Sequence, residues 1–286
     1  MIAIIDGGST KCDWVILEDS GSLHLKTTTL GFNPNIINPD FIAAEINRNA
    51  DLAALVPVIN QVFFYGSGCG VAANADKVKK EFLQIFNEAD IEVKDDMIAA
   101  AYAAYTGRPG LVCILGTGSN SCFFDGENIR VDLPSLGFLI GDEGSGSALG
   151  KHLLRRFFMK KLPADLEQAF RKKYELTIEQ ALQSMYHNPR ANAYLGSFNE
   201  FIAEHKNHSY FQNMVFDEMK NFMDFHILPY PEAREVEINF IGYIAFIYED
   251  ILRAAAAELN LTVGRIVQKP IESLVDYHKK YLLQLS

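Results

Sequence analysis

The sequence predicts an α/β protein built from two domains of similar design. Short apolar runs at residues 1–5 and 111–115 are rich in β-branched side chains and end in glycine-rich turns, so each is predicted to be a buried strand. Each run is followed by further strand-like segments and then by helical segments. The chain of 286 residues is also longer than one hydrophobic core usually supports. We expect residues 1–108, closed by residues 272–286, to form the first domain and residues 109–271 the second.

The first half is predicted to open with three strands. The glycine-rich turn after residue 5 leads to the apolar run 13–17, and a polar turn leads to residues 23–30, which include three consecutive threonines. After an Asn- and Pro-rich turn, apolar spacing predicts helices and β-branched or aromatic runs predict strands. The expected elements are a helix at 39–50, a strand at 61–65, a helix at 74–87, a strand at 91–93 and an alanine-rich helix at 97–105.

The second half repeats this order of elements after a turn-rich segment at residues 106–110. Strands are predicted at 111–115, 121–124 and 129–133, followed by a mostly helical region at 147–225. A strand at 237–241, a helix at 243–259, a strand at 264–267 and a helix at 272–285 complete the chain. No residue-level repeat is visible, so the recurring order itself suggests a duplicated unit of a β-meander followed by helices.

The composition excludes several function classes. The net charge is −10 and the isoelectric point is near 5.2, which argues against nucleic acid or an anionic membrane as the main partner. The four cysteines show no CxxC pair and no metal-ligand spacing. No window reaches transmembrane length, and the first apolar run ends at an acidic residue after five positions, unlike a signal peptide. We expect a cytoplasmic protein with reduced thiols.

Two glycine-rich loops carry the predicted chemistry. Residues 6–11 (DGGSTK) and 116–121 (GTGSNS) each follow a predicted strand directly. Glycines let backbone N–H groups approach an anion closely, and Ser and Thr add hydroxyl donors. Asp6 offers an oxygen ligand for a hard cation such as Mg²⁺. One such loop is most often a plain turn, but two of them predict a phosphate bound from two sides, and hence a nucleotide site.

Three motifs together resemble a known family. Residues 6–11 (DGGSTK), 116–120 (GTGSN) and 141–146 (GDEGSG) are similar to those of the N-acetylglucosamine kinase family. That family is grouped with the BadF/BadG/BcrA/BcrD-type ATPases, in the superfamily of actin, hexokinases and Hsp70-type ATPases. The resemblance implies two ribonuclease-H-like domains flanking a nucleotide cleft. It also implies ATP and Mg²⁺ as cofactors, and phosphorylation of an N-acetylated amino sugar such as N-acetylglucosamine.

The resemblance implies a role for each matching position. Asp96 corresponds to the catalytic aspartate at a helix start, and Asp6 to the acidic residue near the metal. Gly242 corresponds to the adenosine-side glycine. The expected sugar contacts are Asn35, Asn120 and Asp142. The expected ligands of the ATP phosphates are Gly7, Gly8, Ser9, Thr10, Lys11, Gly116, Thr117 and Gly118.

Simpler structural roles stay open for some of these residues. Asp95 or Asp96 could be only the N-cap of a helix, and both roles hold if Asp95 caps while Asp96 faces the substrate. A helix N-terminus would also favour the ionised form that a base needs. Asp142 and Glu143 could form a mere acidic turn before a helix. Lys11 could neutralise phosphate charge or lie in solvent.

A rival function belongs to another class, an ATP-driven conformational switch that acts on a partner protein. The paired Asp95 and Asp96, the Asn33/Asn35 loop and Asp142 favour a sugar instead. No second clustered cysteine accompanies Cys69, which disfavours an activator that carries a metal cluster. The expected partner is therefore a small-molecule amino sugar. The aromatic and methionine content of residues 185–225 fits either a core or the contact surface of a homodimer.

Overall fold

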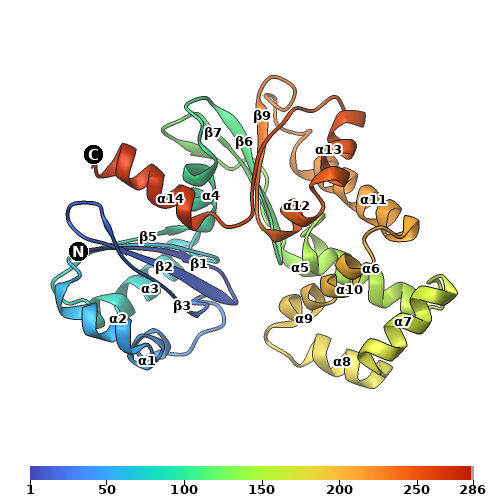
Figure 1. Ribbon diagram of the computed structural model, residues 1–286, viewed down its shortest axis with the longest axis horizontal. Coiled ribbons are helices and arrows are strands. Elements are labelled where there is room, and N and C mark those ends of the chain that lie inside the picture. The colour runs from blue at the N-terminus through green and yellow to red at the C-terminus, as the bar shows by residue number, and fades with distance from the viewer. Residues whose placement is uncertain (285–286) are drawn as a thin grey trace. The chain divides into compact units, whose positions relative to one another are not determined.

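The computed structural model describes residues 1–284 and has the mixed α/β fold that the sequence predicts (Figure 1). By its internal contacts the chain divides into two compact units. Unit 1 is Met1–Tyr105 together with the segment that starts at Lys269, and unit 2 is Thr106–Gln268. The domain boundaries expected after residues 108 and 271 lie a few residues from these limits.

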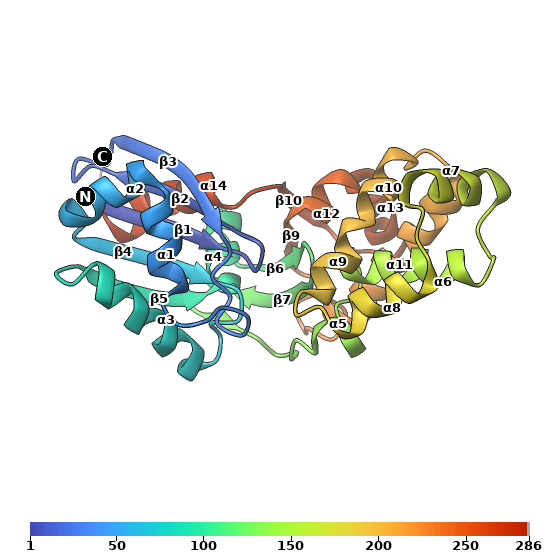
Figure 2. The same ribbon diagram turned by 90° about the horizontal axis from the view of Figure 1, so that it is seen from below.

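Unit 1 is a five-stranded sheet with helices on both faces. The strand order is β3-β2-β1-β4-β5. Strand β2 pairs antiparallel with β1 and with β3, and β4 pairs parallel with β1 and with β5. Helices α1, α2 and α3 cover one face, and α4 and α14 cover the other (Figures 1 and 2). The elements are β1 (Ile2–Gly7), β2 (Lys11–Leu17), β3 (Leu23–Leu30), α1 (Phe41–Arg48), α2 (Ala50–Leu55), a 3₁₀ turn (Val56–Val58), β4 (Gln61–Gly66), α3 (Ala72–Ile85), β5 (Asp90–Asp95), α4 (Asp96–Ala104), α14 (Ile271–Tyr277) and a π-helical turn (His278–Leu282).

Successive side chains of a strand point to opposite faces of the sheet, and those on the covered faces build the core of unit 1. Trp14 of β2 and Phe64 of β4 are buried in the cluster that includes Phe32 and Phe82. The ring of Trp14 meets Phe82 edge-on, with centroids 6.3 Å apart, and its indole N–H donates to the Thr29 hydroxyl over 3.0 Å. The one tryptophan of the chain therefore packs its ring without leaving its polar atom unpaired.

Unit 2 repeats the topology of unit 1. Its strand order is β10-β9-β6-β7-β8, so β6 to β10 take the places of β1 to β5. The recurring order predicted from the sequence therefore corresponds to two copies of one sheet design. The elements are β6 (Gly110–Leu115), β7 (Ser119–Phe124), β8 (Ile129–Arg130), α5 (Gly137–Ile140), α6 (Gly146–Phe158), α7 (Ala164–Tyr174), α8 (Ile178–Tyr186), α9 (Ala191–Ser197), α10 (Asn199–Glu204), α11 (Ser209–His226), β9 (Glu237–Ile241), α12 (Tyr243–Ile247), α13 (Glu249–Glu258) and β10 (Val263–Val267).

Two predicted helices are interrupted, and one strand starts earlier than expected. The helix expected at 39–50 ends at Arg48, because the Asn49 side chain accepts a hydrogen bond from the Leu52 N–H and begins α2. The helix expected at 243–259 breaks at Tyr248. β7 begins at Ser119, so Asn120 lies in a strand and not in the loop where the sequence analysis placed it.

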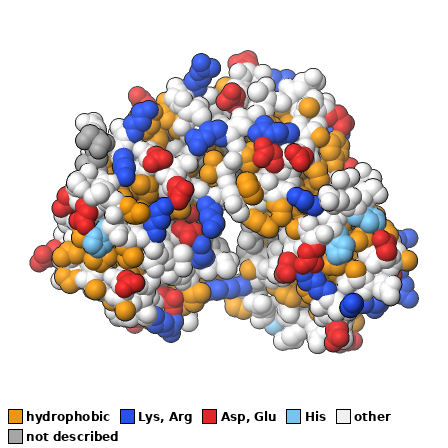
Figure 3. Space-filling model, viewed as in Figure 1, with side chains coloured by type: hydrophobic (Ala, Val, Ile, Leu, Met, Phe, Trp, Pro, Cys, Tyr) orange, Lys and Arg blue, Asp and Glu red, His pale blue; other side chains and the backbone are white. Residues whose placement is uncertain are grey.

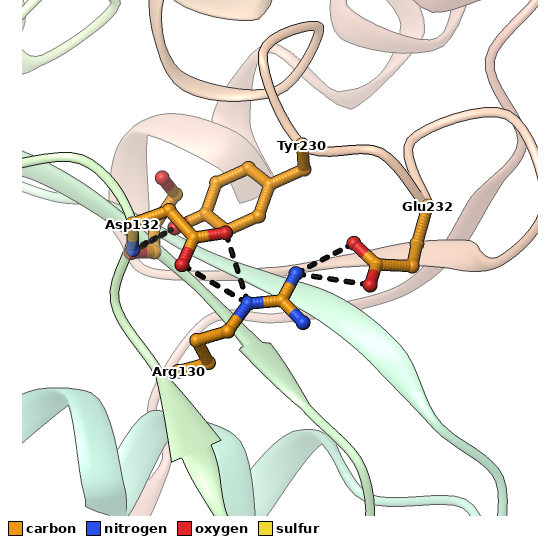
Figure 4. A network of polar contacts seen from close by, with 5 residues as sticks. Arg130, Asp132, Tyr230 and Glu232 are labelled. Atoms are coloured by element: carbon orange, nitrogen blue, oxygen red, sulfur yellow. Dashed lines mark hydrogen bonds and ion pairs between the residues drawn. The ribbon is translucent and has the colours of Figure 1, made fainter.

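The edge strand β8 is shorter than the predicted run of residues 129–133. Beyond it, the Asp132 N–H donates to the Tyr230 hydroxyl over 3.4 Å, and that hydroxyl donates to the Ser121 carbonyl over 3.1 Å (Figure 4). The Arg130 guanidinium bridges the carboxylates of Asp132 and Glu232 at 2.9 and 2.7 Å. Just past the end of β8, the Asp132 N–H therefore donates to a side chain and not to a neighbouring strand.

The surface shows no segregation of charge on the face drawn in Figure 3, where Lys and Arg side chains alternate with Asp and Glu. Among residues 1–284, no helix combines the length and the hydropathy needed to cross a membrane. The four cysteines are buried.

Candidate functional site

The predicted site residues of unit 1 gather at one edge of its sheet. In the parallel pairs, Gly7 of β1 lies opposite Gly66 of β4, and Gly66 lies opposite Asp95 of β5. The three strands therefore end side by side, and the segments that follow them emerge at the same edge. In open α/β sheets, ligands bind at the carboxyl ends of the strands.

The first glycine loop is a tight turn held by close backbone packing. The Gly8 N–H donates to the Lys11 carbonyl over 2.9 Å, and the Ser67 N–H donates to the Gly7 carbonyl over 2.8 Å. A Cβ added at Gly31 would lie 2.4 Å from the Gly8 carbonyl oxygen, so a side chain there would displace the loop. The turn is thus fixed from both sides before any ligand binds.

Asp6 lies beside a second carboxylate on the neighbouring strand. Asp6 of β1 lies opposite Asp13 of β2, and the Lys11 ammonium is 2.6 Å from the Asp13 carboxylate. Burial, and then the charge of Asp13, raise the pKa of Asp6 to about 7, although Lys11 acts to lower it. A divalent cation would relieve this repulsion.

Asp6 and Asp13 place two carboxylates on neighbouring strands, where they could hold a hard cation. Across residues 1–284, no group of three or more His, Cys, Asp or Glu side chains is arranged to hold a metal. Mg²⁺ usually takes one or two carboxylates and completes its shell with water and phosphate oxygens. Asp6 and Asp13 can supply such a pair. Asp13 was not predicted as a site residue, because its position beside Asp6 follows from strand register.

The two aspartates at the start of α4 have different surroundings. The Asp95 carboxylate accepts a hydrogen bond from the Met97 N–H over 3.1 Å and caps the helix. Burial is the largest cause that raises the pKa of Asp96 well above its ordinary value, and the charges of Asp95 and Asp6 add to it. The helix terminus was expected to keep Asp96 ionised, but burial and two carboxylates outweigh that effect here.

Polar side chains tie Asn35 to the first glycine loop. The Asn33 amide donates to the Ser9 hydroxyl over 2.8 Å, and Ser9 donates to Ser67 over 3.3 Å. The Asn35 N–H donates to the Asn33 side-chain oxygen over 3.0 Å, and the Asn74 amide donates to the Asn35 side-chain oxygen over 3.1 Å. No role was predicted for Ser67 or Asn74. The Gly66–Gly68 run after β4 was the available signal for Ser67.

Unit 2 brings its second glycine loop and Gly242 together. β6 and β9 run parallel with Ile114 opposite Ile241, so Gly116 and Gly242 follow neighbouring strand ends. Gly242 has φ of 122°, and an added Cβ would lie 2.4 Å from the Leu115 carbonyl oxygen. Both the backbone angle and the close approach require glycine at this position.

The loop of residues 141–146 packs directly on this turn. Asp142 is buried and accepts a hydrogen bond from the Ser119 N–H over 3.3 Å, and a Cβ on Gly118 would lie 2.9 Å from its carboxylate. The Gly146 N–H donates to the Gly116 carbonyl over 2.8 Å. Burial raises the pKa of Asp142. Asn120 lies on β7 beside this turn, and its side-chain oxygen accepts from the Ser121 N–H over 2.9 Å.

Each unit therefore assembles its own share of the predicted residues. In unit 1 these are Asp6, Gly7, Gly8, Ser9, Thr10, Lys11, Asn35 and Asp96, and in unit 2 they are Gly116, Thr117, Gly118, Asn120, Asp142 and Gly242. A separate cavity of about 450 Å³ lies between α6, α8 and α9, and its lining contains none of these residues.

Residues 5–209 match the model of the BadF/BadG/BcrA/BcrD ATPase family, which is well over half of the chain. The chain belongs to this family. Membership in this ATPase family implies that the protein uses ATP.

The proteins similar to this chain include some that are described as kinases of an amino sugar. A solved structure from Porphyromonas gingivalis, described as a candidate N-acetylglucosamine kinase, is 34% identical, with a TM-score of 0.91 over 98% of this chain and 99% of that chain. A curated N-acetyl-D-glucosamine kinase from Dictyostelium discoideum is 28% identical over 208 residues; the match spans 66% of this chain and 65% of that relative, just under two thirds. A solved structure from Chromobacterium violaceum, described as a candidate N-acetylglucosamine kinase, shares the fold. It is 16% identical, with a TM-score of 0.71 over 97% of this chain and 99% of that chain.

Proposed function

We propose that this protein transfers the γ-phosphoryl group of ATP to a hydroxyl of an N-acetylated amino sugar, N-acetylglucosamine first of all. The observation that carries the proposal is the position of Asp96. It follows β5 at the same sheet edge as Asp6 and the first glycine loop, so a carboxylate that can accept a proton lies beside groups that can bind phosphate and metal. The names of the relatives support the same reaction class.

Backbone and hydroxyl donors of the two glycine loops would bind the ATP phosphates, as residues 7–11 and 116–118 were expected to do. Asp6, with Asp13, would hold Mg²⁺. When bound, that ion supplies positive charge against the charge that develops on the transferring phosphoryl group. Gly242 would lie beside the adenosine, and glycine is required there because a side chain would meet the end of β6.

Asp96 would act as the general base in the transfer. It accepts the proton of the attacking sugar hydroxyl while the hydroxyl oxygen forms its bond to the γ-phosphorus and the bond to ADP breaks. Only the ionised carboxylate can accept this proton, so the raised pKa of Asp96 predicts that the rate increases with pH as this group loses its own proton. Asn35, Asn120 and Asp142 would hydrogen-bond the other polar groups of the sugar and orient it.

A panel assay tests the proposal. ADP release is measured with Mg²⁺-ATP alone and with glucose, mannose, N-acetylglucosamine and N-acetylmannosamine in turn. We expect the rate to rise strongly with an N-acetylated sugar and to depend on magnesium. Steady ATP hydrolysis that no sugar changes would refute the proposal.

A further inference from the structure

One face of helix α11 lies against the loop that carries Asp142. Glu218, Phe222 and His226 are four residues apart on this helix and therefore share a face. All three side chains are buried, and each contacts Glu143 or Gly144.

Glu218 is the central contact of this face. One carboxylate oxygen accepts the Gly144 N–H over 3.1 Å, and the other lies 3.1 Å from His152 Nε2. His152 Nδ1 lies 2.7 Å from an Arg156 guanidinium nitrogen, so Nδ1 is the acceptor and Nε2 donates to Glu218. Burial alone would raise the pKa of Glu218, but the hydrogen bonds from His152 and Gly144 hold it below its ordinary value. Glu218 is therefore an ionised acceptor.

Phe222 and His226 extend the contact along the loop. A Cβ added at Gly144 would lie 2.7 Å from Phe222 Cβ, so the helix leaves no space for a side chain there. His226 Nε2 is 2.9 Å from the Glu143 carboxylate, and its ring stacks on Phe222 with centroids 5.0 Å apart. These contacts fix both residues that follow Asp142.

The loop adopts a conformation that needs such support. Asp142 has φ of 61° and Gly144 has φ of 72°, so two residues of three lie in the left-handed region. A non-glycine residue populates that region sparsely and stays there when its surroundings determine it. Asp142 in turn contacts the second glycine loop through the Ser119 N–H.

We propose that Glu218 and His226 are positioning residues: they hold residues 142–144 in the conformation that presents the Asp142 carboxylate to the sugar. The proposal rests on the proposed function, because it takes Asp142 as a sugar ligand. Neither residue has to touch the substrate for this role.

The test compares Glu218→Ala with Glu218→Gln and Val215→Ala. Gln keeps an oxygen that can accept the Gly144 N–H, whereas Ala removes the acceptor. Val215 is buried in the core one turn before Glu218 and makes none of the contacts to residues 143 and 144 named above, so its truncation lowers stability without removing the acceptor. We measure KM for N-acetylglucosamine and for ATP, together with amide hydrogen exchange of residues 142–146.

Glu218→Ala is expected to raise the sugar KM about ten- to a hundredfold, the effect of losing a hydrogen bond to a charged group. It should also speed exchange of the loop amides and leave the ATP KM close to that of the parent. Glu218→Gln should recover part of the sugar KM, because its amide oxygen can accept the Gly144 N–H while its amide nitrogen cannot accept from His152. If Glu218→Ala fails to fold, His226→Phe serves instead, since it keeps a ring on Phe222 and removes only the donor to Glu143.

Equal sugar KM and equal loop exchange in Glu218→Ala and Val215→Ala would overturn the positioning role. The same holds for His226→Phe if it replaces the first variant. A parent protein that phosphorylates no sugar would refute the proposed function instead, and the exchange comparison would still decide whether α11 holds the loop.

Discussion

The adjacent carboxylates of Asp95 and Asp96 have different roles because their surroundings differ. The Asp95 carboxylate accepts a hydrogen bond from the Met97 N–H and so caps α4, which is the ordinary role of an aspartate at a helix start. Asp96 is not the cap; burial raises its pKa most, and the charges of Asp95 and Asp6 raise it further. Sequence alone predicts a cap at this pair, but which aspartate caps depends on one hydrogen bond that the structure supplies.

Substitution separates the two roles. Asp96→Asn should bind ATP and sugar, melt near the parent temperature, and lose on the order of 10²–10⁴ in rate, because only the proton acceptor is removed. Asp95→Asn should keep most activity, since Asn caps a helix about as well as Asp. Because it removes a negative neighbour of Asp96, it should also move the acid limb of kcat/KM to lower pH. If Asp96→Asn stays within about threefold of the parent rate, the base lies elsewhere.

The raised pKa of Asp6 predicts a pH-dependent response to magnesium. The metal-free folded state holds a proton on Asp6 up to about pH 7, whereas the unfolded chain releases it near 3.8. Unfolding free energy should therefore fall as pH rises through this window, and Asp6→Asn should reduce that fall, leaving the part that the raised pKa of Asp96 contributes. Because the cation competes with the proton, Mg²⁺ should stabilise the parent more at pH 8 than at pH 5.

Urea unfolding of the parent and of Asp6→Asn, with EDTA or with MgCl₂ at both pH values, measures this effect. An identical magnesium response at pH 5 and pH 8 would contradict the assignment of Asp6 to the metal.

At the scale of elements, strand ends were easier to predict than the contacts between them. The apolar run before Asp6 and the run before Gly116 are visible in the sequence, because a buried strand and a glycine turn are local signals. Asp13, Ser67 and Asn74 reach the site only through strand register and loop packing, which one sequence does not encode locally. Side-chain caps such as Asn49 likewise interrupt helices whose apolar spacing continues.

The C-terminal helix α14 offers a test of how the chain closes unit 1. His278, just beyond α14, has no exposed surface, and its Nε2 lies 2.8 Å from the Tyr65 hydroxyl of β4. Tyr277 stacks on Tyr102 of α4 with centroids 4.2 Å apart. Burial lowers the pKa of His278 to about 3, with a smaller effect from the charge of Lys94.

This lowered pKa should make part of the stability pH-dependent. The unfolded chain protonates His278 near pH 6.5, so stability is lost as pH falls from 6.5 toward 3. Between pH 6.5 and 5 the loss from this residue is about 2 kcal/mol. His278→Gln keeps a polar partner for Tyr65 without titrating, and should show a correspondingly smaller loss in urea unfolding. Equal losses in the two proteins would mean that His278 is accessible to protons in the folded state.

At the scale of the whole molecule, one sheet design occurs twice, and each copy places a glycine loop after its first strand. The duplication was predictable because the order of strands and helices recurs along the chain. The packing of α11 on residues 143–144 was not, since its residues lie more than seventy positions from the loop in sequence. Membership in the ATPase family implies that the protein uses ATP. The central proposal is that an N-acetylated amino sugar accepts the phosphoryl group.

The fate of the γ-phosphate tests that proposal most directly. The parent and Asp96→Asn are incubated with γ-labelled ATP, Mg²⁺ and N-acetylglucosamine, and labelled sugar phosphate is separated from inorganic phosphate. We expect the parent to place the label on the sugar in step with ADP release, and Asp96→Asn to form almost none of this product. Label found only in inorganic phosphate, at a rate that the sugar does not change, would contradict it.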